Sequence, residues 1–197
     1  MKVPKTRQKR FALWLALFFV FYALWGSRLL AADKQGTLEF VYGRFTPNDA
    51  RFKAVYQKGG AIQGLILSSY LVSNFNFYLE LKGFSRTGEL TFSKEKTRFI
   101  LVPLTFGVRY ILPTEYLLPY VGAGTDFYFY YEDNPIGTAL NYAHGYHIQG
   151  GTYVRASRSF PLRLNVKLKY TKARTEVNSH QLELGGLEFG IGLAFVF

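Results

Sequence analysis

The sequence predicts an all-β fold, an eight-stranded antiparallel up-and-down transmembrane β-barrel. Three observations lead to this prediction. Apolar and polar side chains alternate along several segments, the connections between these segments alternate in length, and no long apolar stretch follows the amino-terminal region. Strands place successive side chains on opposite faces, so a period of two indicates strands. Tilted strands of about 9–11 residues are long enough to cross a membrane.

The amino-terminal region has the layout of a secretory signal peptide. Five basic residues and no acid lie within residues 1–10, an apolar run extends from Phe11 to Trp25, and small residues end at Ala32. The apolar run is short for a membrane helix, which needs about 20 residues, and this favours a cleaved signal over an uncleaved anchor. We expect a signal peptide at 1–32 and a β-barrel domain at 33–197.

Removal of the signal changes the charge of the chain. Residues 1–32 hold six basic residues and no acid, so the formal charge falls from +11 to +5. Secretion and the lack of a recognition motif argue against a nucleic-acid partner. The chain has no Cys, which excludes a disulfide scaffold and a thiolate metal site. The remaining length of about 165 residues suits one domain.

The clearest strand is expected at 162–171. Every even position there is large and apolar, from Leu162 to Tyr170, and every odd position is polar. Because Lys167 and Lys169 belong away from lipid, this strand also predicts that the apolar faces point outward and the polar faces point into the lumen.

The other strands are less regular but follow the same pattern. They are expected at 37–46, 61–72, 74–85, 98–110, 119–131, 143–157 and 181–197. Short connections are expected around Ser73 and at 113–118 and 158–161, and longer polar ones at 47–60, 86–97, 132–142 and 172–180. Alternating short and long connections are typical of bacterial outer-membrane barrels.

Two features disturb the pattern. Pro103 lies inside a strand with neighbours on both sides, where proline removes a hydrogen bond of the ladder. At Gly185 and Gly186 the apolar phase slips, because Leu184 is even whereas Leu187 begins an odd series. A β-bulge at the glycines would reconcile the two phases.

Several segments resemble the small outer-membrane β-barrel families, which include the OmpA, OmpX and OmpW groups. Residues 102–110 and 118–124 resemble the central hairpin of these families, and 147–154 and 190–197 resemble their sixth and last strands. The resemblance covers 33–197 as a pattern and implies location in the outer membrane of a Gram-negative bacterium. It also implies that the barrel-assembly machinery reads the last strand through Ile191, Leu193, Phe195 and Phe197.

With the apolar faces outward, ten charged side chains point into the lumen. They are Glu39, Glu80, Lys82, Arg109, Asp126, Arg155, Arg163, Lys167, Lys169 and Glu188. Buried charges must be paired or hydrated. One interpretation is an interlocking polar plug, and the other is a weakly anion-preferring channel, given six basic and four acidic groups. The narrow lumen of an eight-stranded barrel favours the plug.

The histidines give little support for catalysis. His144 and His147 are three residues apart, so on one strand they point to opposite faces and chelate poorly. His180 follows Ser179, and such a pair is found in outer-membrane lipid A deacylases and palmitoyltransferases, but no local motif of those enzymes is present. We therefore expect no catalytic residue, no metal and no cofactor.

Aromatic and basic residues mark the expected membrane boundary. Phe127–Tyr131 precede a long connection and suggest an aromatic girdle at the interface, with glycan stacking as the alternative. Basic residues of the long connections could neutralise lipopolysaccharide phosphates, with an ordinary solvated rim as the alternative. These residues are Arg51, Lys53, Lys58, Lys94, Lys96 and Arg98.

The sequence thus predicts an integral outer-membrane protein with a structural or surface-interaction role, a plugged lumen and a monomeric state. Its expected partners are outer-membrane lipid, lipopolysaccharide and, during biogenesis, the barrel-assembly machinery. A small-solute channel is the first alternative and a lipid A-modifying enzyme the second. A secreted soluble barrel of the lipocalin type has the same strand number, but such barrels have largely apolar interiors, unlike the lysine-bearing face of 162–171.

Overall fold

The structure is a computed structural model that describes residues 36–56, 59–90, 94–135, 137–157, 160–177 and 180–197. The signal peptide predicted at 1–32 lies outside these ranges. Within the ranges, no helix has the length and apolar character needed to cross a membrane.

Strands account for most of the described residues. They are β1 Gly36–Pro47, β2 Gly60–Val72, β3 Phe75–Glu89, β4 Lys96–Ile111, β5 Leu117–Asn134, β6 Gly137–Arg155, β7 Leu162–Val177, β8 His180–Glu183 and β9 Gly186–Val196. One short helix, α2 Ala50–Tyr56, lies between β1 and β2.

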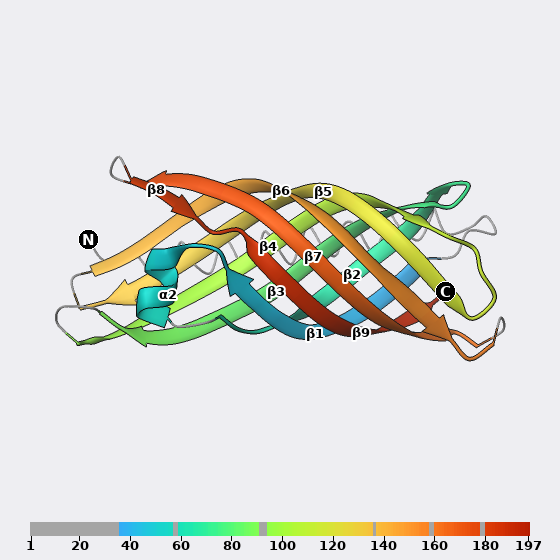
Figure 1. The fold of residues 1–197 in the computed structure, drawn as a ribbon, viewed down its shortest axis with the longest axis horizontal. Helices are drawn as coiled ribbons and strands as arrows, with labels where there is room; N and C mark the ends of the chain where they lie inside the picture. Colours follow the sequence, from blue (N-terminus) through green and yellow to red (C-terminus); the bar gives the residue numbers. More distant parts are fainter. Residues whose placement is uncertain (1–35, 57–58, 91–93, 136, 158–159, 178–179) are drawn as a thin grey trace, which may run out of the picture. The chain divides into compact units, whose positions relative to one another are not determined.

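The sheet closes on itself, with antiparallel neighbours throughout. β1 pairs with β2 on one side and with β9 on the other. β6 pairs with both β5 and β7. β8 and β9 both pair with β7 and share the eighth position around the barrel. The predicted eight-stranded antiparallel barrel is confirmed (Figure 1).

The two ends of the barrel differ. One, here called the α2 end, carries the helix and the β3–β4, β5–β6 and β7–β8 connections. The other, the C-terminal end, carries the β2–β3, β4–β5 and β6–β7 connections and both ends of the barrel segment. There the Gly36 amide donates to the Phe197 carbonyl at 2.7 Å, and the Phe197 amide donates to the Gly36 carbonyl at 3.0 Å.

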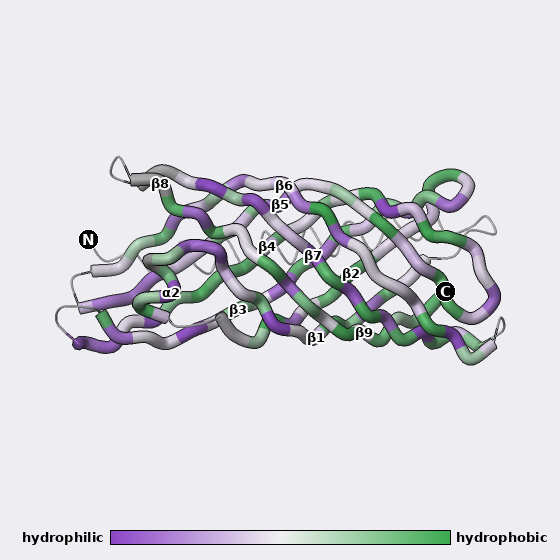
Figure 2. Tube along the Cα trace, in the orientation of Figure 1, coloured by the Kyte–Doolittle hydropathy of each residue, from purple (hydrophilic) through white to green (hydrophobic). Residues whose placement is uncertain are grey.

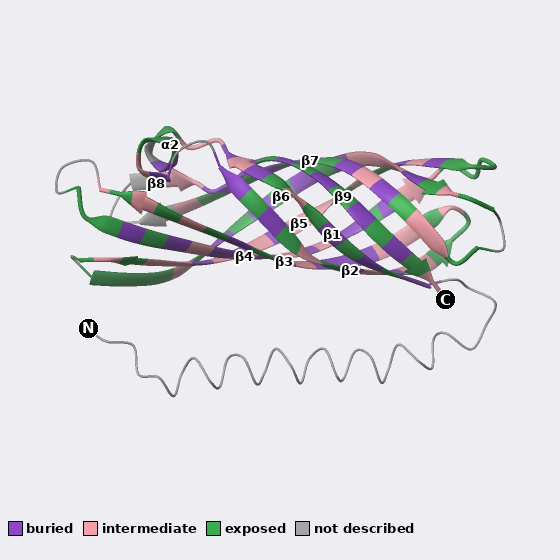
Figure 3. Cartoon of the chain, turned by 90° about the horizontal axis from the view of Figure 1, so that it is seen from below, coloured by how far each residue is buried: buried purple, intermediate pink, exposed green. Residues whose placement is uncertain are grey.

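Side chains alternate between the lumen and the outer surface, as the sequence predicts (Figure 3). In β7, Lys167 and Lys169 are 2% exposed, whereas Leu164 and Leu168 are 49% exposed. Figure 2 shows the matching alternation of hydrophobic and hydrophilic residues along the strands. The barrel is therefore apolar outside and polar inside, which is the arrangement of a membrane barrel and the reverse of a lipocalin.

Three of the expected long connections, 86–97, 132–142 and 172–180, are shorter than predicted, the last because Val177 of β7 pairs with His180 of β8. β3 continues to Glu89 and β4 begins at Lys96, where the two residues pair. β5 and β6 likewise pair up to Asn134 and Gly137. Most of the added residues, such as 86–89 and 132–134, are polar on both faces, so hydrophobic alternation ceases while backbone pairing continues. The sequence pattern therefore underestimates strand length at this end.

Pro103 is accommodated without a change of register. It pairs with Tyr128 of β5. On the β3 side, pairing stops at Leu81–Leu104 and resumes at Phe84–Leu101 with the same register. The missing N–H thus interrupts one ladder over two residue pairs and leaves the strand in place.

The bulge expected at Gly185 and Gly186 is not formed. β8 pairs Glu183 with Arg174, and β9 pairs Gly186 with Thr171, which is a single continuous register along β7. Leu184 is instead buried, because at this height the interior is apolar. The apparent phase slip reflects a change in what fills the barrel.

Candidate functional site

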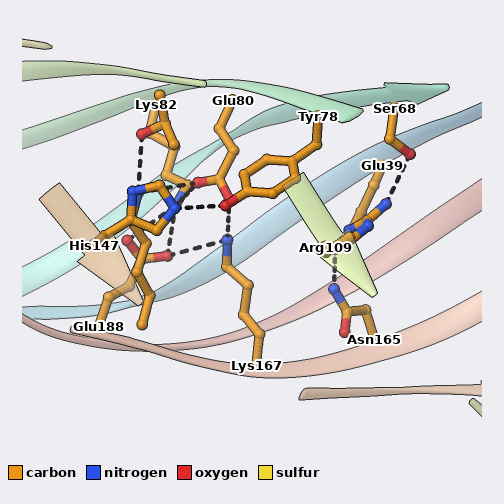
Figure 4. Close-up of polar contacts among 12 residues, drawn as sticks. Glu39, Ser68, Tyr78, Glu80, Lys82, Arg109, His147, Asn165, Lys167 and Glu188 are labelled. Atoms are coloured by element: carbon orange, nitrogen blue, oxygen red, sulfur yellow. Dashed lines mark hydrogen bonds and ion pairs between the residues drawn. The ribbon is translucent and has the colours of Figure 1, made fainter. Parts of the chain in front are cut away.

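A network of charged side chains fills the middle of the barrel. Eight of the ten predicted lumen residues are at least 95% buried: Glu39, Glu80, Lys82, Arg109, Asp126, Lys167, Lys169 and Glu188. They comprise four acids and four bases, so the buried set has no net formal charge. All of them come from strands whose inward positions alternate with outward apolar ones. Figure 4 shows part of this network inside the barrel.

Glu80 and Glu188 lie at the centre of this network. Lys82 Nζ is 2.7 Å from Oε1 of Glu188 and also forms an ion pair with Glu80. Lys167 Nζ is 3.0 Å from Oε1 of Glu80 and 3.6 Å from Oε1 of Glu188. Both carboxylates therefore face both of these lysines, and charge-assisted bonds of this kind satisfy buried ions far better than isolated contacts.

Asp126 is the hub of a second group of contacts. Lys169 donates to its Oδ1 at 2.6 Å, and Thr105 donates to the same oxygen. His147 Nδ1 lies 2.6 Å from its Oδ2, and His147 Nε2 lies 2.5 Å from the Tyr78 hydroxyl oxygen. Lys169 also lies 3.6 Å from Glu80, which connects this group to the central carboxylates.

A third group lies nearer the C-terminal end. The Tyr153 hydroxyl donates to Glu39 Oε2 at 2.8 Å, and the Asn165 amide donates to Glu39 Oε1 at 2.5 Å. Arg109 donates to Ser68 Oγ at 2.7 Å. The Arg109 guanidinium carbon also lies 5.1–5.6 Å from three ring centroids, those of Tyr78, Tyr120 and Tyr153. These aromatic rings thus supply part of the solvation that water would otherwise give this cation.

Two predicted lumen residues lie apart from these contacts. Arg155 is partly exposed and donates to the main-chain carbonyls of Glu115 and Thr114 at 2.6 and 2.9 Å, in the β4–β5 connection. Arg163 is also only partly buried, at the start of β7, which lies at the C-terminal end of the barrel. The surplus of bases in the predicted set came from these two arginines.

The α2 end of the interior is apolar and aromatic. The buried residues of this aromatic cap are Phe45, Phe52, Tyr56, Ile62, Phe84, Phe99, Leu101, Tyr128, Tyr130, Ala143, Ala173 and Leu184. Two of them, Phe52 and Tyr56, come from α2, which was expected to be part of a polar connection. Asp49 Oδ1 accepts from the Phe52 amide at 3.0 Å and caps the helix. The helix therefore contributes aromatic side chains to the barrel interior.

Tyr56 fixes the end of α2 to the strands. Its hydroxyl donates to Glu132 Oε1 at 2.8 Å and lies 2.9 Å from Thr97 Oγ1. Burial raises the pKa of the Tyr56 phenol above its ordinary value, and the nearby Glu132 carboxylate acts in the same direction.

The aromatic girdle predicted at Phe127–Tyr131 needs correction. Tyr128 and Tyr130 are 3% and 4% exposed and belong to the aromatic cap inside the barrel. Phe127, Phe129 and Tyr131 are partly exposed on the outer surface. Residues 127–131 therefore contribute to both the lumen and the outer surface, because successive residues of a strand point to opposite sides.

The histidines lie on opposite faces, as predicted. His144 is exposed and bonds to Thr125 Oγ1 at 2.7 Å, whereas His147 is 3% exposed in the lumen. His147 lies against Asp126 in the lumen. Ser179 and the side chain of His180 lie outside the described residues. In the described ranges, no three His, Cys, Asp or Glu side chains are grouped as metal ligands would be.

The predicted surface sites divide into described and undescribed residues. Lys53, Lys94, Lys96 and Arg98 are exposed at the α2 end. The side chain of Arg51 and all of Lys58 lie outside the described residues. The four residues of the predicted assembly signal are 45–53% exposed on the outer surface: Ile191, Leu193, Phe195 and Phe197.

Several network residues were missed by reasoning from charge alone. Tyr78, Thr105, Tyr120, Tyr153 and Asn165 are all buried and all occupy inward positions of their strands. The alternation that placed the charges also covers these neutral side chains, so a search for every polar inward position would have found them.

Comparison with known proteins gives the fold. No family model matches the sequence, and no curated protein matches it at the sequence level. The structure is similar to Neisserial surface protein A, with 13% identity over 84% of this chain and 98% of that one and a TM-score of 0.60.

Two further structures show the same similarity. One is the outer membrane protein OprG from Pseudomonas aeruginosa (13% identity, 83% and 96% coverage, TM-score 0.66). The other is Ail, the attachment invasion locus protein of Yersinia pestis, in complex with the heparin analogue sucrose octasulfate (11% identity, 84% and 100% coverage, TM-score 0.55). The chain therefore has the fold of small eight-stranded outer-membrane barrels.

Proposed function

We propose that this protein is an integral, monomeric outer-membrane barrel with a structural and surface-contact role and a lumen closed to solutes. The observation that carries the proposal is the neutral set of eight buried charges, each of which contacts a partner from another strand. Removing either member of such a buried pair leaves an uncompensated charge, so the network resists opening.

The aromatic cap supports the same proposal. It fills the interior at the α2 end, above the charged network, with α2 packed into it. A solute would have to displace both an apolar layer and a paired ionic layer. This arrangement supports a closed barrel over a small-solute channel, and the equal number of buried acids and bases removes the basis for an anion preference.

Conductance in a planar lipid bilayer tests the proposal. The refolded wild-type protein is expected to give no steady open-channel steps, and such steps would overturn it. The double variant Lys82→Ala/Glu188→Ala removes a base and an acid together, so it preserves neutrality while it opens space. Steps from this variant would show that the protein inserts, so that a silent wild type cannot reflect failed insertion.

We also propose that the protein is not an enzyme. The contacts Tyr78–His147–Asp126 have the order of a hydroxyl–imidazole–carboxylate relay, but all three side chains are buried among charged partners. Substrate access to the hydroxyl would require dismantling the network. The lipid A of cells with and without the protein should have the same mass profile, and a changed profile would contradict the proposal.

Lipopolysaccharide is the partner proposed for the α2 end. Lys53, Lys94, Lys96 and Arg98 are exposed there, next to the outward apolar surface. Ammonium and guanidinium groups at this height could reach the phosphates of the outer leaflet.

The last strand is proposed as the segment that the barrel-assembly machinery reads, because its large apolar residues are all outward.

A further inference from the structure

An apolar groove of about 830 Å³ lies on the outer surface of the barrel. Its lining comes from six consecutive strands of the sheet, β3, β4, β5, β6, β7 and β9. The floor is low because two outward positions, Ala123 of β5 and Gly150 of β6, carry little side chain. Ile148 of β6 and Leu168 and Tyr170 of β7 form part of its border. A concave apolar surface of this kind is suited to hydrocarbon.

The outer surface becomes aromatic and basic on the α2 side of this groove. Beyond Tyr170, the next two outward pairs of β6 and β7 are Tyr146–Lys172 and His144–Arg174. Directly paired residues of neighbouring strands lie on the same face of a sheet, and these four side chains are all exposed. We call these four residues the β6–β7 strip. Strand register therefore holds two rings and two cations side by side, next to the groove.

The β6–β7 strip combines flat rings with a surplus of positive charge. The centroid of the His144 ring lies 5.0 Å from that of the Tyr146 ring, and Tyr146 is 68% exposed. Glu183 of β8 pairs with Arg174 on the side away from β6. One carboxylate beside the two cations, Lys172 and Arg174, leaves a net positive charge at the strip. This charge attracts an anion.

The strip lies at the level of a lipid head group. A cation is costly in hydrocarbon, so the change from Tyr170 to Lys172 along the outward row of β7 marks the outer boundary of the apolar surface. The groove begins on the hydrocarbon side of this boundary, and the strip lies on the polar side. A ligand that spans both needs an acyl chain on one side and an anionic group on the other.

We infer that the groove and the β6–β7 strip bind lipid A, with an acyl chain in the groove, a sugar ring on Tyr146 and a sugar phosphate on Lys172 and Arg174. This inference rests on the proposed outer-membrane location. It gives the proposed lipopolysaccharide contact a site built from other residues. The tyrosine ring favours lipid A over a glycerophospholipid, because its flat apolar face suits the C–H face of a sugar. The guanidinium suits the phosphate through two parallel N–H···O bonds.

Native mass spectrometry of the protein purified from outer membranes, and stripped of lipid by detergent exchange, tests the inference. The probes are phosphorylated lipid A, the same lipid A after phosphatase treatment, and phosphatidylglycerol. We expect one phosphorylated lipid A per barrel, and binding at least about tenfold weaker for the other two probes. Equal binding of phosphatidylglycerol, or of phosphatase-treated lipid A, would overturn the inference.

Three variants connect the binding to the strip and the groove. Lys172→Gln/Arg174→Gln should weaken lipid A binding at least about tenfold. Tyr146→Leu keeps an apolar side chain without the flat ring, so it should weaken lipid A binding about threefold and leave phosphatidylglycerol binding unchanged.

The third variant, Gly150→Leu, fills the groove and should weaken binding about tenfold, the equivalent of about two buried CH₂ groups. A Cβ atom on Gly150 meets the Tyr120 carbonyl oxygen at 3.7 Å, an ordinary contact, so the barrel should accept the side chain. If heat-modifiable gel mobility shows that this variant does not fold, Ala123→Leu fills the groove from β5 and should have the same effect. Wild-type affinity in the folded groove variant and in Lys172→Gln/Arg174→Gln would overturn the inference.

The control Lys94→Gln/Lys96→Gln removes two cations of the lipopolysaccharide contact proposed for the α2 end, and it should keep the bound lipid A. Loss of lipid A from this control alone would support that contact and overturn the groove site. A wild type that binds no lipid A would overturn the groove site and leave the closed lumen intact, because conductance tests the lumen separately.

Discussion

Lys82 Nζ lies 2.7 Å from Glu188 Oε1, although the two residues are 106 positions apart in the chain. Lys82 belongs to β3 and Glu188 to β9, which are not neighbours in the sheet. The contact therefore crosses the lumen and joins walls that backbone pairing does not join directly. Lys167 of β7 approaches the same carboxylate, so Glu188 links three strands.

Glu188→Gln should lower the stability of the barrel without preventing its assembly. The neutral amide leaves Lys82 and Lys167 without one of their two carboxylates, and breaking a buried pair costs about 3–5 kcal/mol. Urea unfolding in detergent, followed by circular dichroism, measures the loss. Glu89→Gln, at an exposed position at the end of β3, should change the stability little. Equal effects of the two changes would contradict the network.

His147→Leu should destabilise the protein far more than His144→Leu. His147 bonds to Asp126 and Tyr78 in the lumen, and its loss leaves buried polar groups with fewer partners at a cost of about 1–3 kcal/mol. His144 is exposed on the outer surface, so its replacement by an apolar residue should be nearly neutral. The two variants, three residues apart on β6, are compared by heat-modifiable gel mobility and unfolding midpoint. Similar unfolding midpoints for the two variants would show that the contacts of His147 add little to the stability of the barrel.

The docking of α2 should weaken at alkaline pH through Tyr56. Burial raises the pKa of Tyr56 in the folded protein. The contribution of the neutral Tyr56 phenol to the stability of the docked helix is therefore complete below the ordinary phenol pKa of about 10, and it is lost as pH rises above that value. An environment-sensitive dye on Ala54→Cys reports the helix, since the chain has no other cysteine. Tyr56→Phe should reduce the alkaline change in dye signal. An identical change in this variant would assign it to other tyrosines.

Deleting Phe197 should reduce the amount of barrel in the outer membrane. The residue is 45% exposed on the outer surface and lies at the C-terminal end, where it bonds to Gly36. In detergent, where no assembly machinery is present, the deleted chain should still refold, because two terminal bonds are a small part of the ladder. Failure to refold in detergent would assign Phe197 a structural role, and normal membrane levels would remove its role as a signal.

The architecture could be read from the sequence because its strongest regularity is local. In 162–171, alternation sorts Lys167 and Lys169 from Leu164 and Leu168 without reference to any other strand. A membrane barrel requires this sorting on every strand, so the number of strands, the direction of the faces and eight buried charges all followed. Near the α2 end the alternation gives way to polar stretches such as 86–89 and 132–134, and β3–β7 therefore extend further than the pattern indicates.

Other features were decided by the tertiary structure. The sequence does not show that Glu188 meets Lys82, that Asp126 meets His147, or that Arg155 turns to the β4–β5 connection, because these contacts depend on strand register around a closed barrel. The burial of Leu184 and of the aromatic side chains of α2 also depends on closure of the sheet, because their apolar contacts come from several different strands. Alternation along a strand is a property of neighbouring residues, whereas pairing across a lumen depends on residues brought together by closure of the sheet.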